Sequence, residues 1–199
     1  MKEYIIDKVT NFTNWNNIGE FGFSSPWSEE ALPTTLFSAY HDGNSLYFRF
    51  MAFGPKPLVY IHDNNKLEVT KSERVELFFR SNEKMQPYYC LEMDPKGRIL
   101  DYKANFYRQF DRNWQWPESL NIQTKIEKQH YNLQGKISLS VLDKLGILKN
   151  NKIEVGVYRG HCIELKESEA IIKWISWVDP KTKKPDFHVP SSFGVFILN

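Results

Sequence analysis

The chain lacks the features that mark membrane proteins and nucleic-acid-binding proteins. None of its 199 residues belongs to an apolar run of about eighteen or more, the length that a membrane-spanning helix requires. Its 26 Lys and Arg residues are balanced by 24 Asp and Glu residues, and a net charge of +2 excludes the basic surface that attracts nucleic acid. The first twenty or so residues lack the continuous apolar stretch of a signal peptide. As written, the chain indicates an intracellular protein with neither membrane nor nucleic-acid partners. A secreted or periplasmic protein that has lost its leader would read the same.

Cysteine is scarce, and the sequence has no repeat, low-complexity tract or linker. Cys90 and Cys162 are the two cysteines, and their wide separation matches no metal-binding spacing. We expect two free core thiols, with a single disulfide as the alternative, because small thiols are common in protein interiors. The length and composition fit one domain that covers residues 1–199.

Aromatic and β-branched residues are abundant, and they recur with the two-residue period of β-strands. Strands are predicted at residues 46–51, 75–80, 88–93, 122–128, 131–139, 153–159, 170–178 and 194–198. Turn-forming Gly, Asn, Asp or Pro residues occur at 42–44, 63–65, 94–97 and 149–151. Only residues 139–148 have helical spacing, and residues 103–121 read as a long surface loop with some strand at its start. The sequence therefore predicts an all-β fold: an antiparallel β-sandwich, immunoglobulin-like or jelly-roll-like, with one short helix.

The alternation along three of these strands places charged side chains. If the apolar residues of 75–80 and 88–93 face the core, Glu76 and Glu92 face outward and share one open sheet surface. The inward parity of 153–157 puts Arg159 on the core side, where a guanidinium needs an anion or carbonyl groups. We expect its partner to be one of the two glutamates or the C-terminal loop.

The last quarter of the chain is rich in rings and prolines. Trp174 and Trp177 stand on opposite parities of one predicted strand, and a core position is expected for Trp177. Phe187 and His188 follow in a proline-bounded loop. Rigid aromatic and hydrogen-bonding surfaces of this kind suit sugars, because the C–H face of a pyranose packs flat on a ring.

The order of these landmarks resembles the family 9 carbohydrate-binding modules along nearly the whole chain. The shared landmarks are residues 40–43 with 46–48, 75–78, 88–93 with Gly97, 157–159, 176–180, 187–188 and 193–194. The resemblance implies a β-sandwich binding domain that works beside xylan- and cellulose-degrading enzymes and holds the end of a sugar chain between two aromatic rings. It also implies that structural calcium is possible, for which Asp42, Asp63 and Asp94 offer turn carboxylates.

The resemblance assigns roles to individual positions. Glu76 matches a glutamate that bonds sugar hydroxyls, and Glu92 falls where family members place an arginine. Phe187, followed by His188, falls at one clamp tryptophan. The second clamp tryptophan would fall near Thr70, where this chain has no ring.

The expected function is non-catalytic binding of a mono- or oligosaccharide, or of a polysaccharide chain end, in the use of plant-type glycans such as xylan or cellulose. The expected carbohydrate-binding residues are Glu76, Glu92, Arg159, Trp177, Phe187 and His188. Trp114 or Trp116 could supply the missing wall from the long loop. A saccharide ligand and a glycoside hydrolase acting alongside are the expected partners, and no cofactor is expected.

Two other functions remain open at this point. Glu76 and Glu92 form a carboxylate pair, which retaining or inverting glycoside hydrolysis requires. Related sandwiches bind haem through Met and His, for which this chain offers Met51, Met93, His41, His62 and His188.

Overall fold

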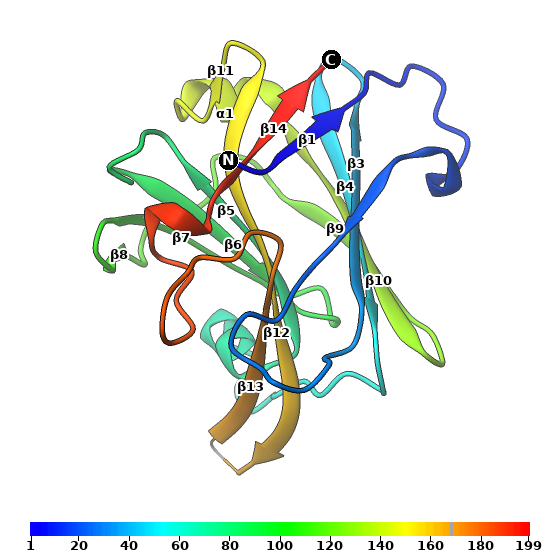
Figure 1. Cartoon of the computed structure of the whole chain (residues 1–199), viewed down its shortest axis with the longest axis vertical. Coiled ribbons are helices and arrows are strands. Elements are labelled where there is room, and N and C mark those ends of the chain that lie inside the picture. The colour runs from blue at the N-terminus through cyan, green and yellow to red at the C-terminus, as the bar shows by residue number, and fades with distance from the viewer. Residues whose placement is uncertain (168) are drawn as a thin grey trace.

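Two β-sheets packed face to face form the protein (Figure 1), and the computed structural model describes residues 1–199 apart from residue 168. The larger sheet follows the order β1 (Glu3–Ile6), β14 (Gly194–Leu198), β12 (Lys152–Lys166), β5 (Arg74–Arg80), β6 (Tyr88–Met93), β7 (Ile99–Asn105) and β8 (Gln109–Asp111). Strands β11 (Leu148–Lys149) and β13 (Glu169–Ser176) also pair with β12. The smaller sheet follows β2 (Glu20–Gly22), β3 (Thr35–His41), β4 (Ser45–Phe53), β10 (His130–Ser138) and β9 (Asn121–Ile126).

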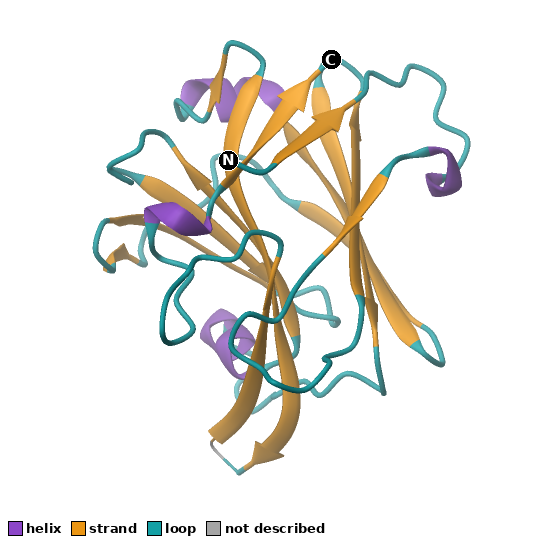
Figure 2. Cartoon of the chain, viewed as in Figure 1, coloured by secondary structure: helices purple, strands orange, loops and turns teal. Residues whose placement is uncertain are grey.

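The strand pairs are antiparallel except for β1 and β14, which run parallel. Helical segments are short and lie outside the two sheets (Figure 2). They are η1 (Trp15–Asn17), η2 (Lys66–Lys71), α1 (Leu139–Lys144) and η3 (Pro190–Ser192). The predicted all-β sandwich with a short helix is confirmed. Among the described residues, no helix is both long and apolar enough to cross a membrane.

The helix predicted within residues 139–148 is present and covers the first six of them. It begins at Leu139 and ends at Lys144, because Gly146 takes a positive φ of 67° that turns the chain back into strand β11. That conformation is open to glycine without steric cost.

The hydrophobic core lies between the sheets and follows the predicted alternation. Val75, Leu77 and Phe79 from β5 meet aromatic residues such as Phe37 and Phe50 of the smaller sheet, all 1% exposed or less. Burial of this apolar surface is the main force that holds the two sheets together. The intervening residues of β5 therefore face away from the core.

A second hydrophobic cluster covers the outer face of the larger sheet. Phe78 and Tyr158 from the strands pack under Phe187 and Phe193 from the segment that follows β13. Figure 1 shows this segment, orange to red, folded back across the sheet before it enters β14. The outward glutamates of β5 and β6 consequently lie beneath a covering layer, and the candidate site is built between the sheet and this layer.

Candidate functional site

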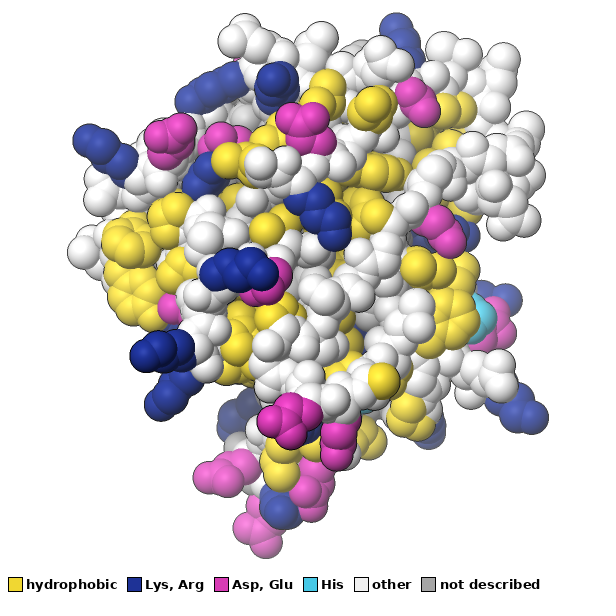
Figure 3. Space-filling model, viewed as in Figure 1, with side chains coloured by type: hydrophobic (Ala, Val, Ile, Leu, Met, Phe, Trp, Pro, Cys, Tyr) yellow, Lys and Arg dark blue, Asp and Glu magenta, His cyan; other side chains and the backbone are white. Residues whose placement is uncertain are grey.

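Two adjoining hollows open on the outer face of the larger sheet. The first, of about 170 Å³, lies between β5, β6, β13 and the C-terminal loop, and the second extends from it toward η2 and β7. Both are lined by Arg74, Glu92, Arg108 and His188. Acidic and basic side chains are interspersed over the face of the molecule drawn in Figure 3.

A buried guanidinium lies between two carboxylates at the base of these hollows. Glu76 and Glu92 are direct neighbours across β5 and β6, as the alternation predicted. Nε of Arg74 lies 2.8 Å from Oε1 of Glu76, to which it donates a hydrogen bond, and 2.8 Å from Oε2 of Glu92. Arg74 also donates to the carbonyl oxygen of Thr70 at 2.9 Å. The side chains of the three charged residues are at most 7% exposed.

The two glutamates differ in their surroundings. Burial, and then the charge of Glu92, raise the pKa of Glu76 to about 8, against the opposing effect of Arg74. Oε1 of Glu92 accepts a hydrogen bond from the Tyr102 hydroxyl at 2.9 Å. Its Oε2 has a short contact with Arg74 but no hydrogen bond of acceptable geometry among the described residues. One buried carboxylate oxygen in the hollow is thus open to a further donor.

His188 is held as a neutral imidazole beside these carboxylates. Its Nδ1 shares a hydrogen bond of 2.9 Å with the Tyr88 hydroxyl, and its ring lies 5.1 Å from that of Phe78. Burial, and then the charge of Arg108, lower the pKa of His188 to about 3. The neutral ring can therefore donate or accept a hydrogen bond at the hollow without carrying charge.

Phe187 forms part of the floor of the covering layer, where the sequence predicted an open clamp ring. Its ring stacks on Tyr158 with centroids 3.9 Å apart and planes at 6°, and the residue is only 5% exposed. Trp174 meets its edge at 5.3 Å. Tyr158 can lie flat on the sheet because a Cβ at Gly156 would overlap its hydroxyl. Gly156 thereby sets the level at which Phe187 rests.

The rim of the hollows is supplied by β8 and by the turn that joins it to β7. Phe110 is 37% exposed and packs edge-on against Tyr102 and His188. Arg108 donates to Asp186 at 2.8 Å, and the Tyr107 hydroxyl donates to the same carboxylate at 2.7 Å. These bonds join the turn after β7 to the C-terminal loop, so the two sides of the opening are held together.

Arg159 lies outside the site, which corrects its expected role. It faces the core side, as the alternation predicted, but its partner is Glu73, whose Oε1 lies 2.6 Å from Nε of Arg159. His161 contacts the other oxygen of Glu73 at 2.9 Å. Although burial acts to raise the pKa of Glu73, His161 and Arg159 hold it below its usual value. This cluster joins the two sheets and takes no part in either hollow.

The tryptophans are also placed differently from the expected clamp. Trp177, predicted to bind carbohydrate, is 2% exposed and stacks on Phe21 in the core. Trp114 and Trp116 pack against Tyr89 and Phe79 on the inward side of the larger sheet, so they do not supply the missing wall near Thr70. That wall is formed by Thr70 itself with Leu67 of η2.

Two of the turn carboxylates expected for calcium already accept hydrogen bonds. Asp42 accepts hydrogen bonds from the amides of Asn44 and Ser45, both at 2.8 Å. Asp94 accepts from two backbone amides of its own turn and from Arg98. Asp63 lies near Glu68, but both oxygens of Glu68 already accept hydrogen bonds. Ligand atoms of His62, Asp63 and Glu68 nevertheless lie within 4.8 Å of one another, so structural calcium stays a prediction.

The Met and His residues expected for haem lie on different faces of the sandwich. Met93 is in the core, whereas His188 covers the outer face of the larger sheet and Met51 is on the outer face of the smaller one. A ring nitrogen of His41 is 3.0 Å from the carbonyl oxygen of Asn199. At least one sheet separates either methionine from His188.

Three residues of the site were missed by the sequence interpretation. Arg74 has the same parity along β5 as Glu76, so it faces the same side of the sheet. Because two buried carboxylates need a cation, the sequence could have indicated Arg74 as their partner. Arg108 and Phe110 lie in the long loop, and no pattern in that loop indicates where it folds.

The fold is shared with solved structures, whereas the sequence is not closely similar to known families. No family model matches the chain, and no curated protein matches it significantly. A solved structure from Bacteroides uniformis ATCC 8492, to which carbohydrate binding has been attributed, superposes with a TM-score of 0.75 at 16% identity, covering 100% of this chain and 99% of that one.

A family 9 carbohydrate-binding module from Caldicellulosiruptor kristjanssonii in complex with glucose superposes with a TM-score of 0.58 at 17% identity, over 100% of this chain and 96% of the module. The complex of a family 9 module from the same organism with cellotriose superposes with a TM-score of 0.61 at 15% identity, over 99% of this chain and 93% of that one. The fold is that of family 9 carbohydrate-binding modules. The resemblance predicted from the landmark residues is confirmed at the level of this family 9-like fold.

Proposed function

We propose that the protein binds the end of a saccharide chain in the two adjoining hollows, without catalysis. The observation that carries the proposal is that Glu92 lines both hollows while its buried Oε2 accepts no hydrogen bond from the described residues. A sugar hydroxyl that donates to this oxygen would satisfy it. Hydrogen bonds to a charged acceptor are about twice as strong as neutral ones.

The surrounding side chains suit the other parts of a sugar. His188 and Arg108 offer hydrogen-bonding groups to ring hydroxyls, while the exposed ring of Phe110 at the rim provides an apolar surface for C–H groups. The small volume of the first hollow favours a terminal sugar over the middle of a chain. The family 9-like modules of similar fold hold glucose and cellotriose, which supports a glucose-type terminal unit.

Binding fits the carboxylates better than hydrolysis does. Glu76 is 2% exposed and Arg74 contacts both carboxylates, so a water molecule and a leaving group have no access to Glu76, and only Glu92 is left to meet a ligand. A glycosidase needs one carboxyl on each side of the scissile bond. We therefore assign Glu76 to holding Arg74 and propose a role beside a separate glycoside hydrolase acting on xylan or cellulose.

Calorimetry and NMR with glucose, cellotriose and xylotriose would test this proposal. Glu92→Gln keeps the shape of the side chain and removes its charge, and we expect it to weaken binding about five- to tenfold. Glu83→Gln, in an exposed turn, is the matched control and should leave affinity unchanged. Unaltered affinity in Glu92→Gln, or no response to any of these sugars, would contradict the proposal. Hydrolysis of an aryl glycoside that disappears in Glu76→Gln would reassign the protein as an enzyme.

A further inference from the structure

The outer face of the smaller sheet carries a second set of rings and amides, far from the hollows above. The register aligns Tyr40, Tyr47, Lys136 and Asn121 in one row across β3, β4, β10 and β9. Arg49, Gln134 and Gln123 form the next row. These side chains alternate with core residues and therefore point away from the larger sheet.

Three parallel rings form one wall of this face. Phe12 stacks on Tyr40 with centroids 4.6 Å apart and planes at 11°, and Tyr40 stacks on Tyr47 at 4.7 Å and 6°. The Tyr47 hydroxyl donates to Asp42 at 3.0 Å, which fixes the last ring. One face of Tyr47 is covered by Tyr40, so its other face is turned toward Lys136 on the next strand.

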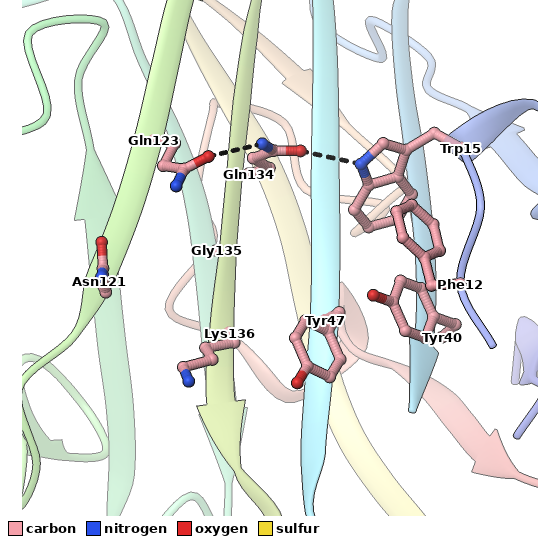
Figure 4. A pocket seen from close by; sticks show the side chains of 9 residues that line it. All are labelled: Phe12, Trp15, Tyr40, Tyr47, Asn121, Gln123, Gln134, Gly135 and Lys136. Carbon is pink, nitrogen blue, oxygen red and sulfur yellow. Dashed lines mark hydrogen bonds between the residues drawn. The ribbon is translucent and has the colours of Figure 1, made fainter. Parts of the chain in front are cut away.

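A chain of side-chain hydrogen bonds runs across the strands from Trp15, which lies beside these rings, to Gln123 on β9 (Figure 4). The indole Nε1 of Trp15 donates to Gln134 at 2.8 Å, and Gln134 donates to Gln123 at 2.9 Å. Because the indole N–H can only donate, this series of hydrogen bonds fixes the orientation of both side-chain amides, with the oxygen of each amide accepting. The free end of Gln123 is a donor group at the exposed end of the series.

Two buried polar atoms of the same face have no hydrogen-bond partner in the part of the chain that the structure describes. Nε of Arg49 and Oδ1 of Asn132 make no hydrogen bond to any described residue, and both residues line the hollow beside Trp15. The Arg49 side chain is 12% exposed, and its nearest carboxylate, Glu20, is 3.9 Å away. An unsatisfied buried group is costly, so a ligand that supplies an acceptor to Arg49 would be favoured.

The charge of this face differs from that of the first site. Its two hollows are lined by Arg49, Lys125 and Lys136 and by no carboxylate among the described residues, and because Lys125 is paired with Glu127 at 2.6 Å, Arg49 and Lys136 are the cations left for a ligand. The amides outnumber the cations, and each amide can both donate to and accept from a hydroxyl group. The lining therefore matches a molecule with many hydroxyl groups and a few negative charges.

We propose that the outer face of the smaller sheet is a second saccharide-binding surface, which takes an acidic oligosaccharide containing uronic acid units. A sugar ring packs on the free face of Tyr47, its hydroxyls bond the amides of Gln123 and Gln134, and carboxylates of the uronic acid units pair with Arg49 and Lys136. A single open ring face and a predominance of amides favour a saccharide over a single-stranded nucleic acid, which needs successive stacking rings along a basic groove.

Indole N–H signals in NMR spectra would test both faces in one titration. Trp15 reports on this face and Trp174 on the first site, and the two signals are assigned with Trp15→Phe and Trp174→Phe. Addition of a glucuronic acid-containing xylo-oligosaccharide should shift the Trp15 signal, and its neutral parent should bind more weakly. Lys136→Gln, at an exposed position, should reduce the affinity for the acidic sugar at least about threefold.

Arg49→Met should remove the preference for the acidic sugar, whereas Glu92→Gln should leave the Trp15 response unchanged. This proposal holds if Trp15 responds while Trp174 does not, so it can survive the failure of the first site. No Trp15 shift with acidic oligosaccharides, an unchanged response in Lys136→Gln, or tighter binding of a single-stranded oligonucleotide at the same salt concentration would overturn it.

Discussion

Glu76 and Glu92 face each other across β5 and β6, and one atom, Nε of Arg74, lies 2.8 Å from an oxygen of each. Two carboxylates and one guanidinium lie together in a layer with little water. Because one positive charge balances only one negative charge, the pair of carboxylates tends to bind one proton. That proton is assigned to Glu76, whose burial is the more complete. The arrangement has consequences for stability that can be measured separately from any ligand.

The pH dependence of stability is expected to depend on Glu76. Its pKa is about 8 in the folded protein and 4.5 ordinarily, so the folded state binds more protons between these values. The resulting stabilisation is complete below about pH 4.5 and is lost as the pH rises through 8. Glu76→Gln cannot ionise, so its melting temperature should fall less between pH 6.5 and 9, by on the order of several degrees.

The interval above pH 6.5 avoids an opposing contribution from His188. Its pKa of about 3 in the folded state means that it adds stability as the pH rises from 3 to its ordinary value of 6.5. Thermal melts of the natural protein, Glu76→Gln and the exposed control Glu83→Gln would separate these effects. Equal slopes in all three proteins would show that Glu76 is ionised at neutral pH.

Removal of the Arg74 guanidinium should strongly destabilise the folded protein. Arg74→Met leaves two carboxylates buried without a cation, and we expect a loss of about 3–5 kcal/mol in the free energy of unfolding. Urea denaturation measures this loss, and Arg112→Met at an exposed position is the control. Adding Glu92→Gln to Arg74→Met should restore part of the stability. A loss below about 1 kcal/mol in Arg74→Met would mean that the pair is solvated.

Arg159 and Glu73 should affect stability without affecting saccharide binding. The pair is at most 2% exposed and faces the inside of the sandwich, so Arg159→Met should cost about 3–5 kcal/mol in the free energy of unfolding. Below its melting temperature the variant should bind cellotriose as the natural protein does. A selective loss of affinity with unchanged stability would return Arg159 to the binding site.

The thiols of Cys90 and Cys162 should be unreactive in the folded protein. Both are free, with exposures of 0% and 3%, and burial raises the pKa of each thiol. An aromatic disulfide reagent should detect neither thiol in native buffer and both in concentrated urea. Cys90→Ala should reduce the denatured signal by half. Rapid reaction without denaturant would contradict the packing around these residues.

The sandwich was predictable because apolar residues alternate along several strands, and strands such as β4 and β10 bury one face only. In β5 the apolar residues alternate with Glu76 and Phe78, and the same alternation placed Glu76 beside Glu92. Strand β3 was not predicted, because its pattern does not alternate: Tyr40 is covered from outside by Phe12, so both faces of the strand are packed.

The details of the site depend on chain segments that no local pattern positions. The alternation showed that Glu76 points outward, but burial of that surface requires the C-terminal loop to fold back over the sheet. Phe187 lines the first hollow, yet its ring face is taken by Tyr158. Arg159 was correctly placed on the core side, but its partner Glu73 precedes β5 and lay outside the strand that was analysed for parity.

The hydrogen atom that replaces a side chain at Gly156 has an effect well beyond its own strand. Tyr158 rests in the space it leaves, Phe187 rests on Tyr158, and the hydroxyl of Tyr158 bonds the oxygen atoms of Ser192. The stacked rings of Tyr158 and Phe187 therefore set the distance between the sheet and the loop that covers the first hollow. A single methyl group at residue 156 would raise that loop, so the depth of the cavity is encoded by a residue that never touches its contents.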